Sequence, residues 1–404
     1  MRKIGIIGGG QLGRMAIEEA RKYLAYIEVL TPEYPSPAAE IADAAHVGLL
    51  ADYESVLEFA EEMDILSYEI EGVSIEALRE LERRGKIVLP AAGILAAIRD
   101  KPEQKRVLGA AGIPTAASAL VEGEAPTAAS LSAAAAALGG FPLVQKARSG
   151  GYDGRGVSIV EGPEGPDILA CPSFLEEKVD IEKELSVVVA LAPDGSTAVY
   201  PCVEMVFDPR ANLCDSVLAP ARVEVAQRDR AEALALACVA ALCEASVASG
   251  SPRSGSAGVF GVEMFLTRSG GLLVNEVAPR PHNSGHFSIE ACVSSQFDQY
   301  IRLLLGHPLG SPELLVPAMM VNLFGEPGES GKPEYLGLKE ALAIPGVTIH
   351  LYGKRELRPF RKMGHLTAQG ATAEETIARA ESARKRIRIV ARNNPMKQAP
   401  RFAP

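Results

Sequence analysis

Two apolar segments, each containing one glutamate, follow one another between Gly258 and His286, and they constrain the fold more than any other part of the sequence. The first reads GVFGVEMFL and contains Glu263; the second reads GLLVNEV and contains Glu276; RSGG between them is typical of a hairpin turn. Carboxylates on neighbouring buried strands are costly unless a cation neutralises them. Mg²⁺ binds one or two carboxylates together with phosphate oxygens. We therefore predict that Glu263 and Glu276 bind Mg²⁺, or Mn²⁺ in its place, beside a phosphate-containing ligand.

A rigid polar segment follows the second glutamate. Arg280, His282 and Asn283 are separated and preceded by prolines in APRPHN. A guanidinium matches a planar, carboxylate-like anion with two parallel hydrogen bonds. His282 and Asn283 can donate to the remaining oxygens of such an anion, and His282 can also transfer a proton. The segment predicts an anion site next to the metal.

Length and charge exclude several classes of function. A chain of 404 residues is expected to form two or three domains. Its formal net charge of −10 argues against nucleic acid or an anionic membrane as partner. We find no apolar run that approaches the length of a membrane span and no room for a signal peptide before the first strand. The six scattered cysteines fit reduced thiols, so a cytoplasmic protein is expected.

The N-terminal part alternates short apolar runs with helical patterns. Strands are predicted over 3–8, 27–30, 64–67 and 87–89, with a helix over 53–62, which indicates a doubly wound, Rossmann-like domain. Gly8, Gly10 and Gly13 match the G-x-G-x-x-G fingerprint of dinucleotide-binding proteins, and Glu33 follows at the usual distance. This signal is weak, because any tight strand-turn-helix connection requires such glycines.

The middle of the chain is α+β in pattern. Asp100 is expected to cap a helix, and strands are predicted over 141–147, 157–160, 173–179 and 183–191. Helices are predicted over 127–138, 227–245 and 287–305. From about residue 311 short strands indicate a small β-rich domain, and the tail over 375–390 is predicted to be a helix with a basic face.

A second glycine-rich segment lies between the strands over 141–147 and 157–160. Its glycines allow backbone N–H groups to wrap a phosphate chain. Lys146 just before it and Lys101 at the start of the preceding helix can neutralise phosphates. The segment EEKV over 176–179 can offer backbone groups to an adenine edge and a carboxylate to a ribose, and Glu184 is a second carboxylate candidate.

In this order, Lys101, Lys146 with GGYDGRG, EEKV with Glu184, and then Glu263 with Asn275-Glu276, the residues resemble the ATP-grasp superfamily. The blocks IGGGQLGRM, SYEIEGV, NEVAPRPHNSGH, SSQFDQYIR and HLYGKRELRPFRKMGH are similar, in sequence order, to the N5-carboxyaminoimidazole ribonucleotide synthetase family. This resemblance extends from residue 4 to residue 365. It implies a preATP-grasp domain over 1–99, an ATP-grasp domain over 100–310 with a lid subdomain around 115–180, a C-terminal domain over 311–404, and a homodimer.

The resemblance also implies the chemistry and the residues that carry it. ATP, bicarbonate and 5-aminoimidazole ribonucleotide would be the substrates, and carboxyphosphate the intermediate. Catalytic roles are implied for Arg280, His282, Asn283 and Lys354. ATP contacts are implied for Lys101, Lys146, Gly151, Tyr152, Asp153, Gly154, Arg155, Gly156, Glu176, Glu177, Lys178, Val179, Glu184, Asn275 and Glu276. Contacts to the ribonucleotide are implied for Gln11, Leu12, Glu71, Tyr152, Lys354, Arg361 and Lys362.

Two alternatives remain open at this point. One is a nicotinamide-dependent oxidoreductase that uses only GGGQLG, which would leave Lys146 and the paired glutamates unexplained. The other is a different ATP-grasp ligase, such as a biotin carboxylase or a formate-using transformylase, which shares phosphate activation but differs in its nucleophile.

Overall fold

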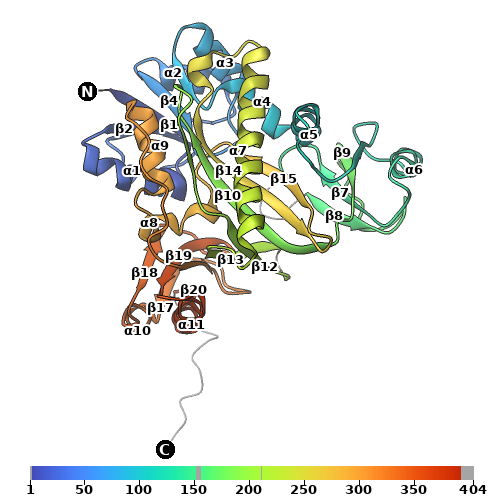
Figure 1. Cartoon of the computed structure of the whole chain (residues 1–404). Helices are drawn as coiled ribbons and strands as arrows, with labels where there is room; N and C mark the ends of the chain where they lie inside the picture. Colours follow the sequence, from blue (N-terminus) through green and yellow to red (C-terminus); the bar gives the residue numbers. More distant parts are fainter. Residues whose placement is uncertain (1, 152–155, 211, 393–404) are drawn as a thin grey trace, which may run out of the picture. The chain divides into compact units, whose positions relative to one another are not determined.

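The structure is a computed structural model that describes residues 2–151, 156–210 and 212–392 (Figure 1). The chain forms two compact units, Met1–Leu315 and Val316–Pro404. The first unit contains a parallel sheet, a large antiparallel sheet and a small antiparallel sheet, and the second unit contains two small antiparallel sheets. This is the mixed α/β and α+β architecture expected from the sequence.

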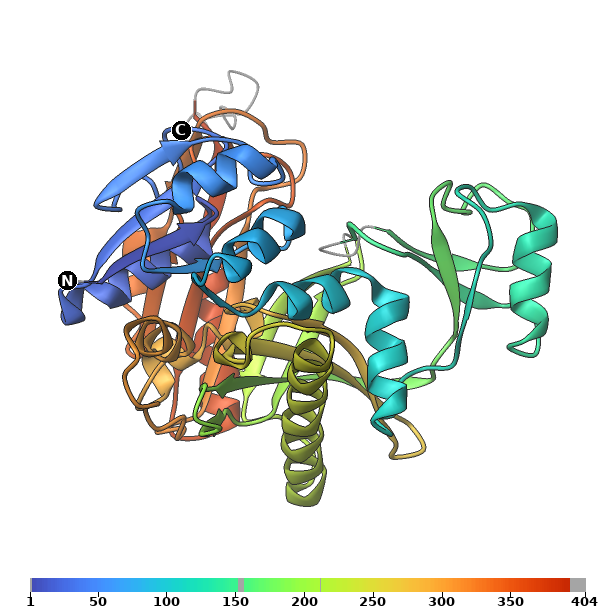
Figure 2. The ribbon, with the colours of Figure 1, turned by 90° about the horizontal axis from the view of Figure 1, so that it is seen from above.

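The first sheet has five parallel strands in the order β3-β2-β1-β4-β5. Its strands β1 (Lys3–Ile7), β2 (Tyr26–Thr31), β4 (Ile65–Tyr68) and β5 (Ile87–Leu89) confirm the predicted runs, and β3 (Ala44–Val47) lies at one edge. The isoleucines of β1 are fully buried, as expected for a parallel strand covered on both faces. Figure 2 shows the sheet in blue with its helices beside it, namely α1 (Gln11–Ala20), η1 (Arg21–Tyr23), α2 (Tyr53–Ala60), α3 (Ile75–Arg83) and α4 (Ala92–Arg99).

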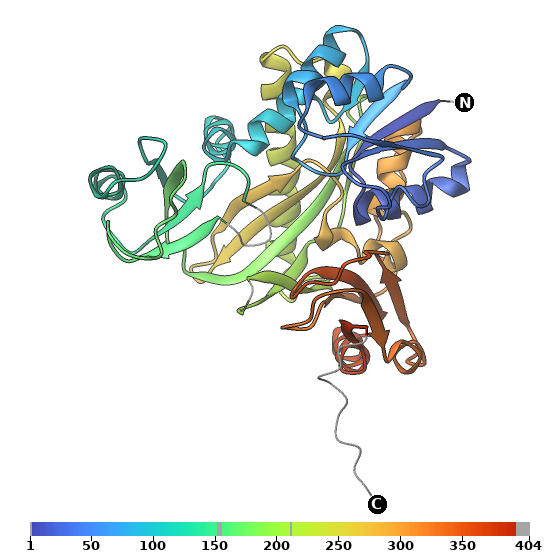
Figure 3. The same cartoon turned by 180° about the vertical axis from the view of Figure 1, so that it is seen from behind.

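The second sheet of the first unit carries the long central hairpin. Its order is β15-β14-β10-β12-β13, with β11 also paired to β10. The predicted hairpin is confirmed as β14 (Gly258–Thr267) and β15 (Leu272–Ala278), which are antiparallel. Figure 3 shows these strands running beside β10. The remaining elements are α5 (Lys101–Ala110), β10 (Ile181–Leu191), β11 (Thr197–Val199), β12 (Val203–Asp208), β13 (Leu213–Ala219), α7 (Val225–Ala248) and η2 (Arg253–Gly255).

Helix α7 is long and apolar enough to cross a membrane by length and composition alone, so the expectation that no such segment exists was wrong in that respect. The helix packs one face on β10 and β14, and its Ala235, Cys238, Val239 and Leu242 belong to the core cluster beneath those strands. This packing accounts for its apolar composition, because a core helix needs the same residues as a membrane span.

A small four-stranded sheet in the order β6-β9-β7-β8 forms the region predicted to be a lid, which is called the lid below. It contains β6 (Ser118–Leu120), α6 (Ala128–Ala136), β7 (Leu143–Ala147), β8 (Val157–Val160) and β9 (Ser173–Glu177). Leu131, Leu143 and Leu175 form its own small core. The lid is joined to β15 where Thr115 pairs with Val274 and the N–H of Val274 donates to the carbonyl of Pro114 at 2.8 Å.

The single helix predicted over 287–305 was wrong. The structure has η3 (Asn283–Gly285), α8 (Ser288–Ala291) and α9 (Gln296–Leu305) instead. Cys292 is extended, with φ −115° and ψ 159°, and it pairs with Leu314. Ser295 starts α9 because its hydroxyl accepts a hydrogen bond from the N–H of Asp298 at 3.0 Å. A serine cap inside an apolar periodic pattern was the signal for this break.

The second unit is β-rich, as predicted. Strands β16 (Ala318–Phe324), β19 (Lys362–Gln369) and β18 (Val347–Leu351) form one antiparallel sheet, and β17 (Pro333–Leu336) pairs with β20 (Arg388–Ala391). The helices are α10 (Leu338–Leu342) and α11 (Ala373–Arg384). The helix predicted over 375–390 was therefore wrong beyond Arg384. There the sequence RIRIV alternates, with Ile387 and Ile389 buried, and such a period of two favours a strand.

Candidate active site

The two glutamates of the central hairpin lie directly opposite each other. Glu263 on β14 pairs in register with Glu276 on β15, whereas the next residue, Met264, pairs with Val274. Asn275 is therefore an extra residue in β15, that is, a β-bulge, and a bulge re-aims the side chains beside it. The amide oxygen of Asn275 accepts a hydrogen bond from Lys146 Nζ at 2.9 Å, and Glu276 forms an ion pair with Lys101. Three oxygen-bearing side chains thus lie together on adjacent strands.

A chain of alternating charges connects this hairpin to the lid. Lys146 Nζ on β7 lies 2.6 Å from Glu176 Oε2, and Lys105 Nζ on α5 lies 2.7 Å from Glu176 Oε1. Glu176 is 3% exposed, so its two oxygens are engaged by lysines inside the protein. Sequence analysis missed Lys105, although it lies one helical turn after Lys101 and therefore on the same face of α5.

The opposite charges in this cluster stabilise one another's ionised forms. Burial alone would lower the pKa of Lys101, but the charge and hydrogen bond of Glu276, together with the charges of Glu71 and Glu263, outweigh burial and raise it. Burial alone would raise the pKa of Glu276, and the charges of Lys101 and Lys146 lower it instead. Both groups are therefore ionised at neutral pH. Burial raises the pKa of Glu184 to about 7 against the opposing effect of Lys146, so this carboxyl can donate or accept a hydrogen bond near neutral pH.

The Arg-Pro-His-Asn segment begins just after β15 and returns toward β14. His282 Nδ1 accepts from the N–H of Ser284 at 3.4 Å and lies 2.8 Å from its hydroxyl, which leaves the proton on Nε2. That nitrogen lies 3.3 Å from Glu263 Oε1. Gly261 permits this approach, because a Cβ there would lie 2.4 Å from the Cβ of His282. Asn283 is half-buried in η3 beside it.

Arg280 forms an ion pair with a glutamate of the parallel-sheet region. Its Nη2 lies 3.0 Å from Glu71 Oε1, and both side chains are partly exposed. Glu71 belongs to the block SYEIEGV and follows β4, so the ion pair joins the parallel sheet to the hairpin. This contact, together with the hydrogen bond from Nη1 to the carbonyl of Pro281 at 3.3 Å, orients the guanidinium.

The structure describes the segment predicted to contact adenine, residues 176–179, and only the two ends of the glycine-rich segment predicted to bind phosphate. Glu177 accepts from the N–H of Ala117 at 3.1 Å, and Lys178 and Val179 lie in the connection to β10. Gly151 and Gly156 flank the glycine-rich loop, and Gly156 has φ +74° with a Cβ position only 3.0 Å from that of Ala147, which favours glycine. Tyr152, Asp153, Gly154 and Arg155 lie outside the described residues.

A buried carboxylate that sequence analysis did not identify, Glu69 just after β4, contacts the glycine turn before α1. Glu69 Oε1 accepts the N–H of Gly10 at 2.7 Å, and Glu69 is 8% exposed. A Cβ at Gly8 would lie 2.5 Å from Glu69 Cγ. The carboxylate thus takes the place at the helix N-terminus that a pyrophosphate would need, which disfavours the dinucleotide alternative. Gln11 and Leu12 begin α1 next to this turn.

The basic residues predicted to bind the ribonucleotide phosphate lie in the second unit. Lys354 Nζ donates to the carbonyl of Lys362 at 2.7 Å, and Arg361 donates to the carbonyl of Glu356 at 2.7 Å. Lys354 also lies 5.5 Å from the centre of the buried Tyr352 ring. Lys354 and Arg361 are thus each held by a backbone carbonyl of the segment that also contains Lys362.

Within the described ranges, no three histidine, cysteine, aspartate or glutamate side chains form a preassembled metal cage. The donors present nevertheless fit Mg²⁺, because Glu263, Glu276 and Asn275 supply hard oxygen ligands and Mg²⁺ takes the rest of its shell from phosphate and water. The metal itself stays a prediction.

Three stretches of the chain match domain families. Residues 1–99 match the ribonucleotide synthetase preATP-grasp domain, residues 106–297 the ATP-grasp domain, and residues 318–379 the phosphoribosylaminoimidazole carboxylase C-terminal domain.

Individual relatives agree with these matches. The crystal structure of N5-carboxyaminoimidazole ribonucleotide synthetase from Thermotoga maritima is 43% identical, with a TM-score of 0.86 over 97% of this chain and 100% of that one. The Aspergillus clavatus N5-carboxyaminoimidazole synthase in complex with ADP and 5-aminoimidazole ribonucleotide is 33% identical, with a TM-score of 0.83 over 95% and 97% of the two chains. The phosphoribosylaminoimidazole carboxylase of Ogataea methanolica is 39% identical over 90% of this chain, which spans only 65% of that protein. The chain therefore belongs to the N5-carboxyaminoimidazole ribonucleotide synthetase family of ATP-grasp enzymes.

Proposed function

We propose that the protein carboxylates 5-aminoimidazole ribonucleotide with bicarbonate at the expense of ATP in purine biosynthesis. A bicarbonate oxygen attacks the γ-phosphorus of ATP, the bond to the β-phosphate oxygen breaks, and carboxyphosphate and ADP form. The exocyclic amine of the ribonucleotide then attacks the carboxyl carbon, directly or as released CO₂. Loss of phosphate and of the amine proton gives N5-carboxyaminoimidazole ribonucleotide.

The observation that carries this proposal is that carboxylates and lysine ammonium groups lie together at one hairpin. Glu263 and Glu276 lie in register with Lys101 and Lys146 beside them. His282 contacts Glu263 from the loop that also holds Arg280. Phosphoryl transfer needs chiefly positioning and neutralised charge. The lysines supply positive charge for a triphosphate, and the loop with Arg280 and His282 supplies an anion site next to it.

Each residue has a distinct part in this scheme. Glu263, Glu276 and Asn275 would hold Mg²⁺, which neutralises the phosphate charge when bound. Lys101 and Lys146 bind phosphate oxygens, and Arg280 binds the bicarbonate with its planar guanidinium. His282 presents its Nε2 proton to a bicarbonate oxygen and fixes its orientation, because a weak nucleophile must be held close to the phosphorus.

The alternative nucleophile is tested by substrate dependence. ADP release should require both bicarbonate and 5-aminoimidazole ribonucleotide, and formate should not replace bicarbonate. Coupled detection of ADP with each substrate omitted in turn measures this dependence. ADP release that follows formate instead would assign the chain to another ATP-grasp reaction.

We expect Lys354→Ala to raise the KM for the ribonucleotide by about tenfold, with the KM for ATP changed by less than about twofold. Lys354 would contact the ribonucleotide phosphate, and one lost charge-assisted hydrogen bond is worth that much. Steady-state kinetics with each substrate varied gives both constants. Lys332→Ala changes an exposed lysine of the same unit outside the predicted site and is the control. A rise confined to the KM for ATP would move the phosphate site elsewhere.

We further propose a cytoplasmic homodimer. All six cysteines lie in the described part of the chain and none is in a disulfide, which supports a reducing compartment. Light scattering after size-exclusion chromatography measures the oligomeric state, and a monomeric mass at micromolar concentration would contradict the dimer.

A further inference from the structure

A buried glutamine on α9 holds the backbone of His282 from both sides. Gln296 Oε1 accepts the N–H of His282 at 2.8 Å, and Gln296 Nε2 donates to the carbonyl of the same residue at 2.7 Å. Gln296 is fully buried. One side-chain amide therefore satisfies both backbone groups of the residue whose ring faces Glu263, as a neighbouring strand would.

The surrounding contacts leave Gln296 little freedom. Its own N–H donates to the hydroxyl of Ser288 at 3.0 Å, and that hydroxyl donates to the carbonyl of Gly285 at 2.6 Å. Gly285 has no side chain, and a Cβ there would lie 2.5 Å from Gln296 Oε1. The loop from His282 to Gly285 is thus shaped around this amide.

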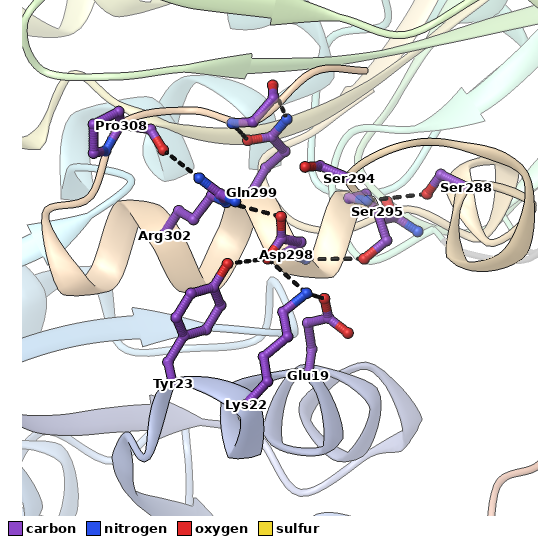
Figure 4. Close-up of polar contacts among 12 residues, drawn as sticks. Glu19, Lys22, Tyr23, Ser288, Ser294, Ser295, Asp298, Gln299, Arg302 and Pro308 are labelled. Atoms are coloured by element: carbon purple, nitrogen blue, oxygen red, sulfur yellow. Dashed lines mark hydrogen bonds and ion pairs between the residues drawn. The ribbon is translucent and has the colours of Figure 1, made fainter. Parts of the chain in front are cut away.

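Helix α9 is itself fixed at the next turns. Asp298, 1% exposed, accepts from Tyr23 Oη at 2.5 Å and pairs with Lys22 at 2.9 Å and Arg302 at 2.8 Å (Figure 4). Tyr23 and Lys22 belong to η1 of the first domain, below α9 in Figure 4. Gln296 therefore acts from a helix that is anchored independently of the loop it holds.

We infer that Gln296 is a positioning residue that sets the place of the His282 imidazole against Glu263 and the bicarbonate. Its two bonds fix the backbone of His282, and the hydroxyl of Ser284 then orients the ring. The part of this inference that concerns bicarbonate depends on the proposed function; the effect on the ring of His282 does not.

The chain offers a matched control one turn further along the same helix. Gln299 is also fully buried, and it holds Gly310 in the same way, accepting its N–H at 2.8 Å and donating to its carbonyl at 2.7 Å. Gln296→Met and Gln299→Met each remove two buried hydrogen bonds to one backbone residue at nearly constant volume, and the first also removes the contact of Gln296 Nε2 with His286 Nδ1 at 3.0 Å. The two variants should therefore lose similar amounts of folding stability, whereas only Gln296→Met removes contacts with His282.

Gln296→Met should lower kcat for ADP release by about 100-fold with little change in the KM for ATP, because displacement of a reacting group by about 1 Å has that effect. Gln299→Met should stay within about threefold of the wild type, since its partners are separate. The ring resonances of His282 in NMR spectra should shift in the first variant and not in the second. Equal losses of activity together with an unmoved His282 signal would overturn the inference.

Gln296→Glu provides a second test if the methionine variant does not fold. Its carboxyl keeps the acceptor for the N–H of His282 but donates to the carbonyl only when protonated, so its activity relative to the wild type should recover as the pH falls. A pH profile parallel to that of the wild type would contradict the inference. Absence of bicarbonate- and ribonucleotide-dependent ADP release in the wild type would reject the proposed function instead, and the NMR comparison would still decide the role of Gln296.

Discussion

Replacing Glu276 by glutamine should reduce ADP release by about 1000-fold or more while the protein stays folded. The carboxylate has two partners in the proposed reaction, the metal and Lys101. Glutamine keeps the shape but supplies only a neutral oxygen, so the phosphate charge is less neutralised when the bond breaks. Lys101 also loses its ion-pair partner, so the effect of burial on the pKa of that lysine is opposed only by the charges of Glu71 and Glu263. Initial rates at saturating substrates, with a circular dichroism spectrum of the variant, measure both expectations.

Glu204→Gln is the matched control for this variant. Glu204 is a buried carboxylate on β12 of the same sheet, paired with Arg222 at 2.8 Å and with Lys183 at 2.9 Å. It lies opposite Leu185, the neighbour of Glu184, and therefore on the other face of the sheet. Its replacement should cost stability but leave kcat within about threefold. Comparable rate losses in the two variants would show that Glu276 acts through folding rather than through the metal.

The hairpin itself was predictable because two strong local signals coincide there. Apolar β-type runs of ordinary strand length flank a glycine turn, so the antiparallel pairing of the two strands follows from the turn position, whereas the exact partner of Glu263 depends on the bulge. The bulge at Asn275 was not predictable. It depends on which residue is left out of register, and the lysines that contact Asn275 and Glu276 come from distant segments.

The errors have a common physical origin. The helices predicted over 287–305 and 375–390 include Cys292 and most of β20, although the serine cap at Ser295 and the alternation in RIRIV favour a break at each place. Tertiary pairing then decided the backbone: Cys292 pairs with Leu314, and β20 pairs with β17.

Residues that act through others were missed for a related reason. Glu69 and Gln296 lie inside blocks that resemble the family and Lys105 lies outside them, but the role of each residue becomes visible only from its contact with Gly10, His282 or Glu176. Chemistry-bearing types in known patterns are visible in a sequence, whereas the partners that orient them become visible only after folding. The predicted contacts of the ligands themselves stay predictions for the same reason.

Asp298→Asn should lower the free energy of unfolding at pH 7 by about 3 kcal/mol, toward the lower end for buried ion pairs because Lys22 is half-exposed. The change leaves Lys22, Arg302 and Tyr23 without their shared anion (Figure 4). Urea unfolding of the two proteins gives the difference. Asp180→Asn removes an exposed pair with Arg268, both more than half exposed, and should change stability by less than about 0.5 kcal/mol.

The same residue predicts how that difference depends on pH. Burial alone would raise the pKa of Asp298, but hydrogen bonds from Tyr23, Lys22 and Arg302 outweigh it and lower the pKa from 3.8 to about 2. A carboxyl with a lowered pKa stabilises the folded state fully above its unfolded pKa and loses that contribution as the pH falls toward its folded pKa. The stability advantage of the wild type over Asp298→Asn should therefore be constant above about pH 5 and shrink between about pH 4 and pH 2. If the stability advantage stays unchanged down to pH 3, the packing of the Asp298 side chain, rather than its charge, stabilises the contact between α9 and η1.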